Sequence, residues 1–450
     1  MKLKNILKYL FIAVVAMQLA SCDNKEDVDP IFDQTPTERL NAQKKELNDL
    51  LESSEFGWKA VYFTDTTQLG GFTHLFKFKS GSVDMASDFD NDTAIYKSEY
   101  GIELGSTVSL VFTTKNKIHL LSDSNNFPVA SLRGKGYKGD FQFLYYGQDN
   151  GQIIFKTNRS FEELRFVKAT AQDWTNLALN RAMIPNVVGA STRPLFRLLE
   201  TNDGTKTSQF DFNFTQPSRF AIANSIETGS SVSYNMGIAY TPTGIIVSPA
   251  VKVGTQKLSE FTYDAITGNF NATGTNGVSA VIKYSNKPLI ITEDYKVMLQ
   301  KPSTGYGYIL PNLANAASNS IFFNKLISDI NAGLPSTQKV SRIDFTFNNV
   351  NNESYVIYRF TGGKTLIYQN ITLAEDAVNK TMKMTTTSWQ SNTGATIAEP
   401  ALLKNFAAEL TNSAGLYVKK ESFKIGAPNN IFTFTTASGS GFRMTTYAFQ

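Results

Sequence analysis

The stretch FQFLYYGQDNGQIIFK, residues 141–156, indicates most directly how this chain folds. Two runs rich in aromatic and aliphatic residues, 141–145 and 153–156, flank the segment QDNG at 148–151. Asn-Gly between two such runs is a strong β-hairpin signal, because both residues tolerate the positive φ of a tight turn between antiparallel strands. The sequence therefore predicts an antiparallel hairpin at this position.

Similar runs recur on both sides of this hairpin, separated by short polar segments. They lie at 59–63, 75–78, 108–112, 118–121, 161–167, 210–214, 219–223, 232–240, 244–247, 261–263, 278–284, 342–347, 355–360, 365–370, 416–424, 431–435 and 442–449. Strands that follow one another through short turns pair most simply with their chain neighbours, in the antiparallel sense. The runs therefore predict antiparallel sheets and meanders.

Helical periodicity appears in only a few places. Thr35, Pro36 and Glu38 are typical of a helix start, with Thr35 and Glu38 in the spacing of a capping box. Apolar residues at helical spacing follow there and again near 171–183, near 320–332 and after Pro400. We predict a mainly β (α+β) fold of antiparallel sheets with about four short covering helices, in two to three domains.

The alternation of helices and strand groups suggests where the chain divides. We expect a signal peptide at 1–21, a flexible linker at 22–34 and a helix with an antiparallel β domain at 35–170. A second β-rich domain would occupy 171–305 and a C-terminal α+β domain 306–450.

The first residues indicate export and lipid anchoring. Three lysines precede the apolar run 9–17, which is too short for a comfortable membrane span. The next segment, Leu19-Ala20-Ser21-Cys22, resembles the lipobox of bacterial lipoproteins, in which the cysteine is acylated before cleavage. We therefore predict that Cys22 is lipidated and holds the protein at a membrane, since two or three acyl chains anchor almost permanently. An ordinary signal with a chance cysteine is the alternative.

The charged residues after Cys22 suggest which membrane surface carries the anchor. Lys25, Glu26 and Asp27 resemble the surface-export signal of Bacteroidetes lipoproteins, a lysine and two acids close to the acylated cysteine. We expect an outer-membrane anchor facing the cell exterior. A plain charged linker, with the protein facing the periplasm, is the alternative.

Charge and cysteine content exclude several kinds of chemistry. Of the 43 Lys and Arg residues three precede Cys22, which leaves 40 basic against 39 acidic residues. A near-neutral body without a basic stripe gives no reason to expect a nucleic-acid partner. Since Cys22 is the only cysteine, the chain can form no internal disulfide and no Cys-ligated metal site. The two histidines, His74 and His119, lie in apparent strands, and we expect both to be structural.

One group of acids imitates a calcium loop. Asp88, Asp90, Asp92 and Glu99 follow the order in which such a loop supplies its oxygen ligands. A threonine stands where the loop needs glycine for its sharp turn, and no helices flank the segment, so a solvated loop is the favoured interpretation. Calcium is the only cofactor that the sequence suggests, and we otherwise predict none.

Two further patterns could serve a ligand. The segment GKGYKG, 134–139, has dinucleotide-binding glycine spacing, but a strand follows where that motif needs a helix, so we predict a loop. Trp389 lies in the polar stretch TTTSWQ and is the one tryptophan that we consider as a platform for a sugar ring. Trp58 and Trp174 have apolar neighbours at strand or helix spacing, so we assign them to the core.

Several segments resemble a known family. They are FDQTPTERL at 32–40, GWK at 57–59, GFTHLFKF at 71–78, IHL at 118–120, GDFQF at 139–143 and TPTGI at 241–245. In this order they resemble a family of Bacteroidetes lipoproteins, domain of unknown function 4302, over roughly residues 30–300. The resemblance implies a lipoprotein often encoded beside outer-membrane nutrient-uptake proteins, which are its implied partners. It implies no activity and no site residues.

The predicted targeting signals and the family resemblance together lead to a functional hypothesis. We expect a cell-surface lipoprotein that is a non-enzymatic accessory in the capture of a nutrient, either a glycan or a peptide. A carboxylate-dependent hydrolase is one alternative, because its two acids would be close only in space. A structural or adhesive envelope protein is the other.

Overall fold

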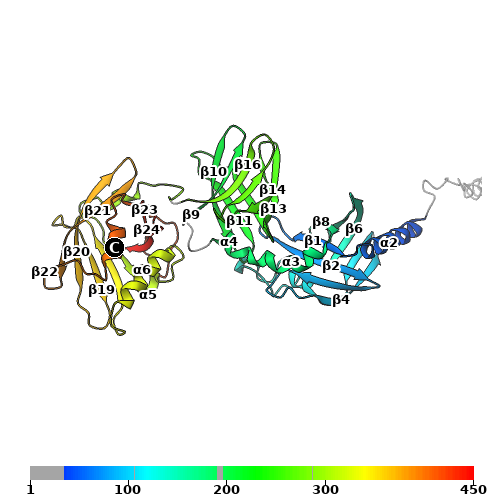
Figure 1. Ribbon diagram of the computed structural model, residues 1–450, viewed down its shortest axis with the longest axis horizontal. Helices are drawn as coiled ribbons and strands as arrows, with labels where there is room; N and C mark the ends of the chain where they lie inside the picture. Colours follow the sequence, from blue (N-terminus) through cyan, green and yellow to red (C-terminus); the bar gives the residue numbers. More distant parts are fainter. Residues whose placement is uncertain (1–34, 106, 190–195, 286, 450) are drawn as a thin grey trace, which may run out of the picture.

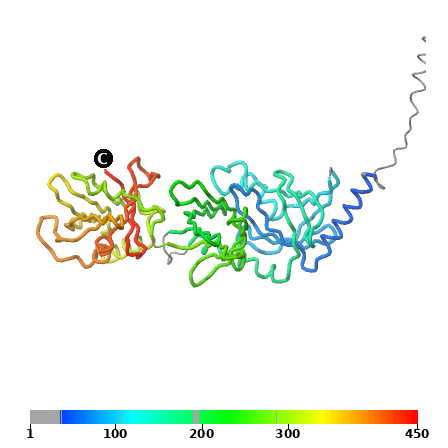
Figure 2. Tube along the Cα trace, turned by 90° about the horizontal axis from the view of Figure 1, so that it is seen from above, coloured from blue at the N-terminus to red at the C-terminus, as the bar shows by residue number. Residues whose placement is uncertain are grey.

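The computed structural model describes residues 35–105, 107–189, 196–285 and 287–449. It is mainly β and consists of three antiparallel bodies in a row (Figure 1). Helix α2 (Pro36–Glu52) extends from the outer end of the first body, and the third body lies at the far end of the row in both views (Figure 2). The predicted mainly β fold of several domains is confirmed.

The first body is a closed eight-stranded barrel in which each strand pairs with its neighbour in the chain. Its strands are β1 (Trp58–Phe63), β2 (Gly71–Lys79), β3 (Ser82–Ser87), β4 (Tyr96–Leu104), β5 (Val108–Phe112), β6 (Gln142–Asp149), β7 (Gln152–Thr157) and β8 (Glu163–Lys168). The pairing of Trp58 with Lys168 closes the ring. The predicted hairpin is β6–β7, and Asn150 and Gly151 have the positive φ values of 50° and 76° that its turn requires.

Apolar side chains fill the first barrel, and α2 covers one of its ends. Alternate residues of the strands point inward, which packs Trp58, Phe76 and Phe143 among other rings. Leu47 and Leu51 of α2 join this core, and the Trp58 indole Nε1 donates a hydrogen bond to the Leu51 carbonyl. The capping box at the start of α2 is confirmed.

The second body is another closed eight-stranded barrel. Its strands are β9 (Phe196–Asp203), β10 (Thr207–Thr215), β11 (Phe220–Ser225), β12 (Ser233–Thr241), β13 (Gly244–Val253), β14 (Gln256–Tyr263), β15 (Phe270–Thr273) and β16 (Val278–Ser285). Helices α3 (Ala171–Ala182) and α4 (Ile184–Val188) connect the two barrels. The predicted helix near 171–183 is confirmed as α3.

The two barrels are in close contact at their backbones. The Gly70 amide donates a hydrogen bond to the Ser218 carbonyl, and the Ile238 amide donates to the Arg219 carbonyl. A Cβ at Gly70 would lie only 2.3 Å from the Arg219 carbonyl oxygen, so only glycine permits this approach. The junction therefore includes direct contact between the backbones of the two barrels.

The third body is a nine-stranded sheet whose additional pairing of β20 with β21 joins eight of the strands into a ring. Its strands are β17 (Tyr306–Ile309), β18 (Val340–Thr346), β19 (Tyr355–Phe360), β20 (Ile367–Asp376), β21 (Thr381–Ser391), β22 (Thr396–Ile397), β23 (Leu416–Lys420), β24 (Ile431–Thr436) and β25 (Arg443–Ala448). Helices α5 (Leu310–Leu313), α6 (Ile321–Ala332) and α7 (Lys404–Leu410) accompany it. The helix predicted near 320–332 is confirmed as α6, and the one expected after Pro400 begins at Lys404.

The predicted strands differ from the structure in two ways. The run 118–121 forms a 3-10 helix, η1 (Lys117–Leu121), because the Asn116 side chain accepts a hydrogen bond from the Ile118 amide and starts a turn. Conversely, the predicted strands did not include β3, β4, β9, β15, β17, β21 and β22. Among the described residues no helix has both the length and the hydrophobicity that crossing a membrane requires.

Candidate functional site

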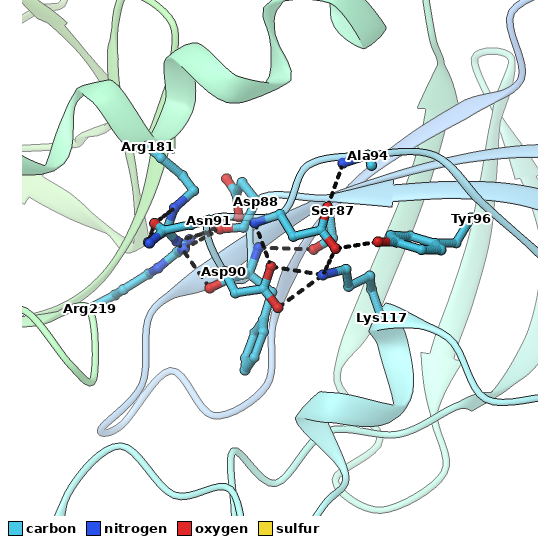
Figure 3. A network of polar contacts seen from close by, with 11 residues as sticks. Ser87, Asp88, Asp90, Asn91, Ala94, Tyr96, Lys117, Arg181 and Arg219 are labelled. Atoms are coloured by element: carbon cyan, nitrogen blue, oxygen red, sulfur yellow. Dashed lines mark hydrogen bonds and ion pairs between the residues drawn. The ribbon is translucent and has the colours of Figure 1, made fainter.

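Asp88, the first acid of the suggested calcium loop, directly follows β3 and is completely buried between the barrels (Figure 3). One carboxylate oxygen, Oδ1, lies 3.0 Å from Arg219 Nη1 and accepts a hydrogen bond from the Thr73 amide. The other, Oδ2, accepts one from Asn180 Nδ2 of α3 at 2.9 Å. Asp88 is thus committed to joining both barrels and α3, and it is not available to a ligand.

Arg219 reaches Asp88 from a tight turn of the second barrel, where its backbone has a φ of 50°. The centre of its guanidinium lies 4.1 Å from the Phe72 ring and 4.6 Å from the Tyr240 ring. Nη1 also donates a hydrogen bond to the Gly71 carbonyl, and Nη2 donates one to the Asp88 carbonyl. Planar contacts to rings and a forked set of donors suit arginine in a buried position. We therefore assign this network a structural role.

Asp90 and Asp92 share one lysine, Lys117, which Figure 3 shows beside Asp90. The Lys117 ammonium lies 2.8 Å from Asp90 Oδ1 and 3.2 Å from Asp92 Oδ2. Burial opposes the charge of this ammonium, but hydrogen bonds to the two carboxylates outweigh burial and raise the pKa of Lys117. Glu99 is exposed on β4.

The four acids therefore do not form one ligand set. A calcium ion needs six to eight oxygen atoms around one point, and here one acid is buried against an arginine while two neutralise a lysine. In the part of the chain that the structure describes, no group of three or more His, Cys, Asp or Glu residues could hold a metal ion.

Trp389 lies on β21 and faces the core of the third body. Its side chain is only 5% exposed, and its ring stacks on Tyr358 with the centroids 5.9 Å apart. A buried ring cannot offer its face to a sugar, so Trp389 is not an open platform. The polar neighbours that suggested exposure are strand residues that alternate with it.

The two histidines occupy different surroundings. His74 is buried inside the first barrel, and neither ring nitrogen has a hydrogen-bond partner among the described residues. Burial and the charge of Arg219 lower the pKa of His74 to about 3, so the ring is neutral at physiological pH. His119 belongs to η1, not to a strand, and stacks on Phe141.

A polar hollow of about 570 Å³ lies at the end of the first barrel opposite α2. Three segments form it: the turn after β1, the long connection between β5 and β6, and the turn between β7 and β8. The lining residues are hydroxyl-bearing or charged, apart from one glycine. They are Thr64, Asp65, Ser122, Ser124, Gly134, Lys135, Lys138, Arg159, Ser160 and Glu162.

The glycine-rich segment 134–139 supplies one wall of this hollow. It is a loop, as predicted, and no helix follows it. Gly136 has a φ of 60°, and a Cβ there would lie 2.2 Å from the Asp123 carbonyl oxygen, so the loop folds tightly against 122–126. The tight loop presents Lys135 and Lys138 to the hollow.

Opposite charges hold the hollow in shape. The Lys138 ammonium lies 2.6 Å from Asp65 Oδ2, and Arg159 Nε lies 3.8 Å from Asp140 Oδ1. Burial raises the pKa of Asp65, but the hydrogen bond from Lys138 and those from Thr67 and Gln68 outweigh burial and lower that pKa to about 2. Asp65 is therefore ionised at neutral pH and can only accept hydrogen bonds.

The Thr64 side chain contributes to the wall of the hollow, but its hydroxyl oxygen is buried and is not open to a ligand. This oxygen has no hydrogen-bond partner within the described residues. Sequence reasoning missed this site, because residues up to about a hundred positions apart meet only after the barrel closes.

The residues of the expected lipid anchor and export signal lie outside the described residues. These are Cys22, Lys25, Glu26 and Asp27. The structure therefore leaves their roles as predictions.

Comparison with known proteins identifies a family. No curated protein matches the chain. Among solved structures the chain is similar to Caulobacter crescentus pol III beta, with 8% identity, a TM-score of 0.18 and coverage of 87% of this chain and 91% of that chain. It is also similar to the DNA polymerase sliding clamp from Bacillus subtilis, with 9% identity, a TM-score of 0.15 and coverage of 90% and 97%. Likenesses at these scores support no conclusion about this chain.

The family model covers the first barrel and most of the second. Residues 28–265 match the family described as Domain of unknown function (DUF4302), which is more than half of the 450 residues. The chain therefore belongs to the DUF4302 family.

Proposed function

We propose that this protein is a lipid-anchored cell-surface lipoprotein that captures a glycan nutrient without transforming it. The observation that carries the proposal is the polar hollow at the end of the first barrel. Specific small-molecule sites are concave and contain a few well-placed polar groups.

The chemistry of the lining favours a ligand rich in hydroxyl groups. Sugar hydroxyls both donate and accept hydrogen bonds, and the hollow offers both functions. Lys135 and Arg159 can donate, and the carboxylate of Glu162 can accept.

The place of the hollow suits a tethered receptor. Acylated Cys22 would hold the chain at the outer membrane, ahead of α2, with Lys25, Glu26 and Asp27 directing it to the outer face. Helix α2 covers one end of the first barrel, and the hollow is at the other end. The hollow would then open away from the tether, where it could pass its ligand to outer-membrane uptake proteins.

A glycoside hydrolase is the second candidate, because Asp65 and Glu162 both line the hollow. Such an enzyme needs one carboxyl group that stays protonated to act as general acid. The pKa of Asp65 near 2 makes it unfit for that role. An adhesive role by strand addition is less favoured, since both barrels close and the described strand that lies outside the ring of the third body, β22, has only two residues.

A glycan array probed with the full chain in detergent tests the proposal. We expect binding to at least one oligosaccharide, with the oligosaccharide unchanged in mass after prolonged incubation. Replacing Lys135 and Arg159 together by Ala should weaken that binding by about tenfold or more, as the loss of two charge-assisted hydrogen bonds implies.

The matched control replaces Lys44 and Lys45, two exposed lysines of α2 at the opposite end of the barrel, by Ala. This variant should bind as the unaltered protein does. An array without any bound oligosaccharide would contradict glycan capture, and a cleaved oligosaccharide would favour the hydrolase.

A further inference from the structure

We infer that Tyr146 and Phe161 form an aromatic subsite that stacks on a sugar ring next to the hollow. This inference rests on the proposed glycan capture and extends it to a second binding surface. The subsite would hold a sugar residue that continues beyond the one in the hollow, so the ligand class is an oligosaccharide rather than a single sugar.

The two rings are exposed and adjacent. Tyr146 lies on β6 and is 50% exposed, while Phe161 lies in the turn between β7 and β8 and is 51% exposed. Their centroids are 5.7 Å apart and their planes are almost perpendicular, at 87°. Each ring excludes water from part of the other, yet half of each remains open to a ligand. Large aromatic side chains gain most from burial, so an exposed pair is typical of a recognition surface.

The position of Phe161 in the chain connects this pair to the hollow. Its two neighbours, Ser160 and Glu162, both line the hollow. Phe161 itself is not part of the lining, so its ring lies beside the hollow, where a second sugar of the same oligosaccharide would contact it.

The backbone of Phe161 is in an unfavourable conformation. Its φ is 62°, in the left-handed region that bulky residues rarely adopt. Asn or Gly would satisfy this turn at lower conformational cost, so the turn itself gives no reason for phenylalanine. Strained backbone of this kind concentrates at binding and catalytic positions, where the side chain is what matters.

A lysine completes the surface. The Lys156 ammonium lies 4.7 Å from the centroid of Phe161 and 5.5 Å from that of Tyr146. This cation–π contact holds the ammonium close to both rings and polarises the two rings. A pyranose has an apolar face of C–H groups and a rim of hydroxyls. The rings would contact the apolar face, and Lys156 would donate a hydrogen bond to the rim.

The test compares Phe161→Asn and Tyr146→Ser with the unaltered full chain on the same array of immobilised oligosaccharides. We expect each variant to bind about three- to tenfold more weakly, as the loss of one aromatic contact implies. Phe161→Asn should keep or raise the melting temperature, because Asn tolerates the left-handed backbone. Phe161→Tyr, which keeps a ring, should retain binding.

The matched control is Phe423→Asn, which removes another exposed phenylalanine, 39% exposed in the third body. It should leave binding unchanged. If Phe161→Asn and Tyr146→Ser bind normally while the Lys135 and Arg159 double variant loses binding, the aromatic subsite is wrong and glycan capture stands. If the unaltered chain binds no oligosaccharide, both proposals are wrong.

Discussion

The guanidinium of Arg219, in the second barrel, lies 3.0 Å from the carboxylate of Asp88, in the first, and both side chains are buried. Removing two charges from water is costly, and their mutual attraction offsets that cost only when further hydrogen bonds satisfy them. Here Thr73 and Asn180 supply those bonds to Asp88. The pair therefore ties the two barrels and α3 to one arrangement.

Breaking this pair should destabilise the protein strongly. Arg219→Met leaves Asp88 buried without a counter-ion and should lower the free energy of unfolding by about 3–5 kcal/mol. Urea denaturation measures the change. Lys45→Met, which breaks the exposed pair with Asp49, is the control and should cost less than about 1 kcal/mol. The double variant Asp88→Asn with Arg219→Met should recover part of the lost stability. If Arg219→Met costs less stability than Lys45→Met, the pair does not hold the barrels together.

Gly70 should not accept a side chain. In Gly70→Ala the new Cβ would meet the Arg219 carbonyl at 2.3 Å, and backbone on both sides must move to relieve the clash. We expect a loss of about 1–3 kcal/mol in the free energy of unfolding. Gly101→Ala is a matched strand control, since the nearest atom to its Cβ is Thr113 Cγ2 at 3.7 Å. Equal stability of the two variants would show that the barrels are not in contact at Gly70.

His74 should make the protein sensitive to acid. Burial and Arg219 lower the pKa of His74 to about 3, whereas an unfolded histidine titrates near 6.5. Between pH 3 and pH 6.5 the histidine is protonated in the unfolded chain but neutral in the folded chain. The contribution of His74 to stability is therefore highest above pH 6.5 and decreases as the pH falls. The contribution of this one residue is about 1.4 kcal/mol per pH unit.

The comparison of His74→Leu with the unaltered chain isolates this contribution. Carboxyl groups titrate equally in both, so they cancel in the difference. The free energy of unfolding at pH 7 and at pH 5, from urea denaturation, should decrease less in the variant. Identical decreases in both proteins would show that His74 is not the group responsible.

Trp389 should act on stability and not on ligand binding. Trp389→Ala removes a buried ring from its stack on Tyr358 and should cost about 3–5 kcal/mol. The folded fraction of the variant should bind oligosaccharides as before. Phe423→Ala, at an exposed position, should change stability by less than about 1 kcal/mol. A stable Trp389→Ala variant that loses binding would reverse this assignment.

Cys22 should carry the acyl chains. Because Cys22 is the only cysteine, Cys22→Ala should abolish metabolic labelling with palmitate and release the protein from membranes. Persistent labelling would disprove the anchor. Replacing Lys25, Glu26 and Asp27 by Ala should reduce protease accessibility on intact cells, while Asn24→Ala, which leaves the three charges, should not. Unchanged accessibility in the triple variant would remove the support for surface export.

Local sequence determined the elements whose hydrogen bonds are made within a few residues. The capping box at Thr35 and Glu38 and the β6–β7 hairpin at Asn150 and Gly151 could be predicted because their signals and their partners are adjacent in the chain. The prediction of a strand at 118–121 was wrong. This run is only four residues long, and the Asn116 cap starts a 3-10 helix there instead.

Only the tertiary structure decided what these elements enclose. Ring closure brings the turn at Asp65, the loop at Lys138 and the turn at Arg159 to one end of a barrel, and it buries Asp88 and Trp389. These residues are polar or aromatic with polar neighbours, so the local pattern is the same whether a side chain points to solvent, to a core or to a ligand. Burial and charge pairing depend on distances between segments far apart in the sequence, and only the folded chain sets those distances.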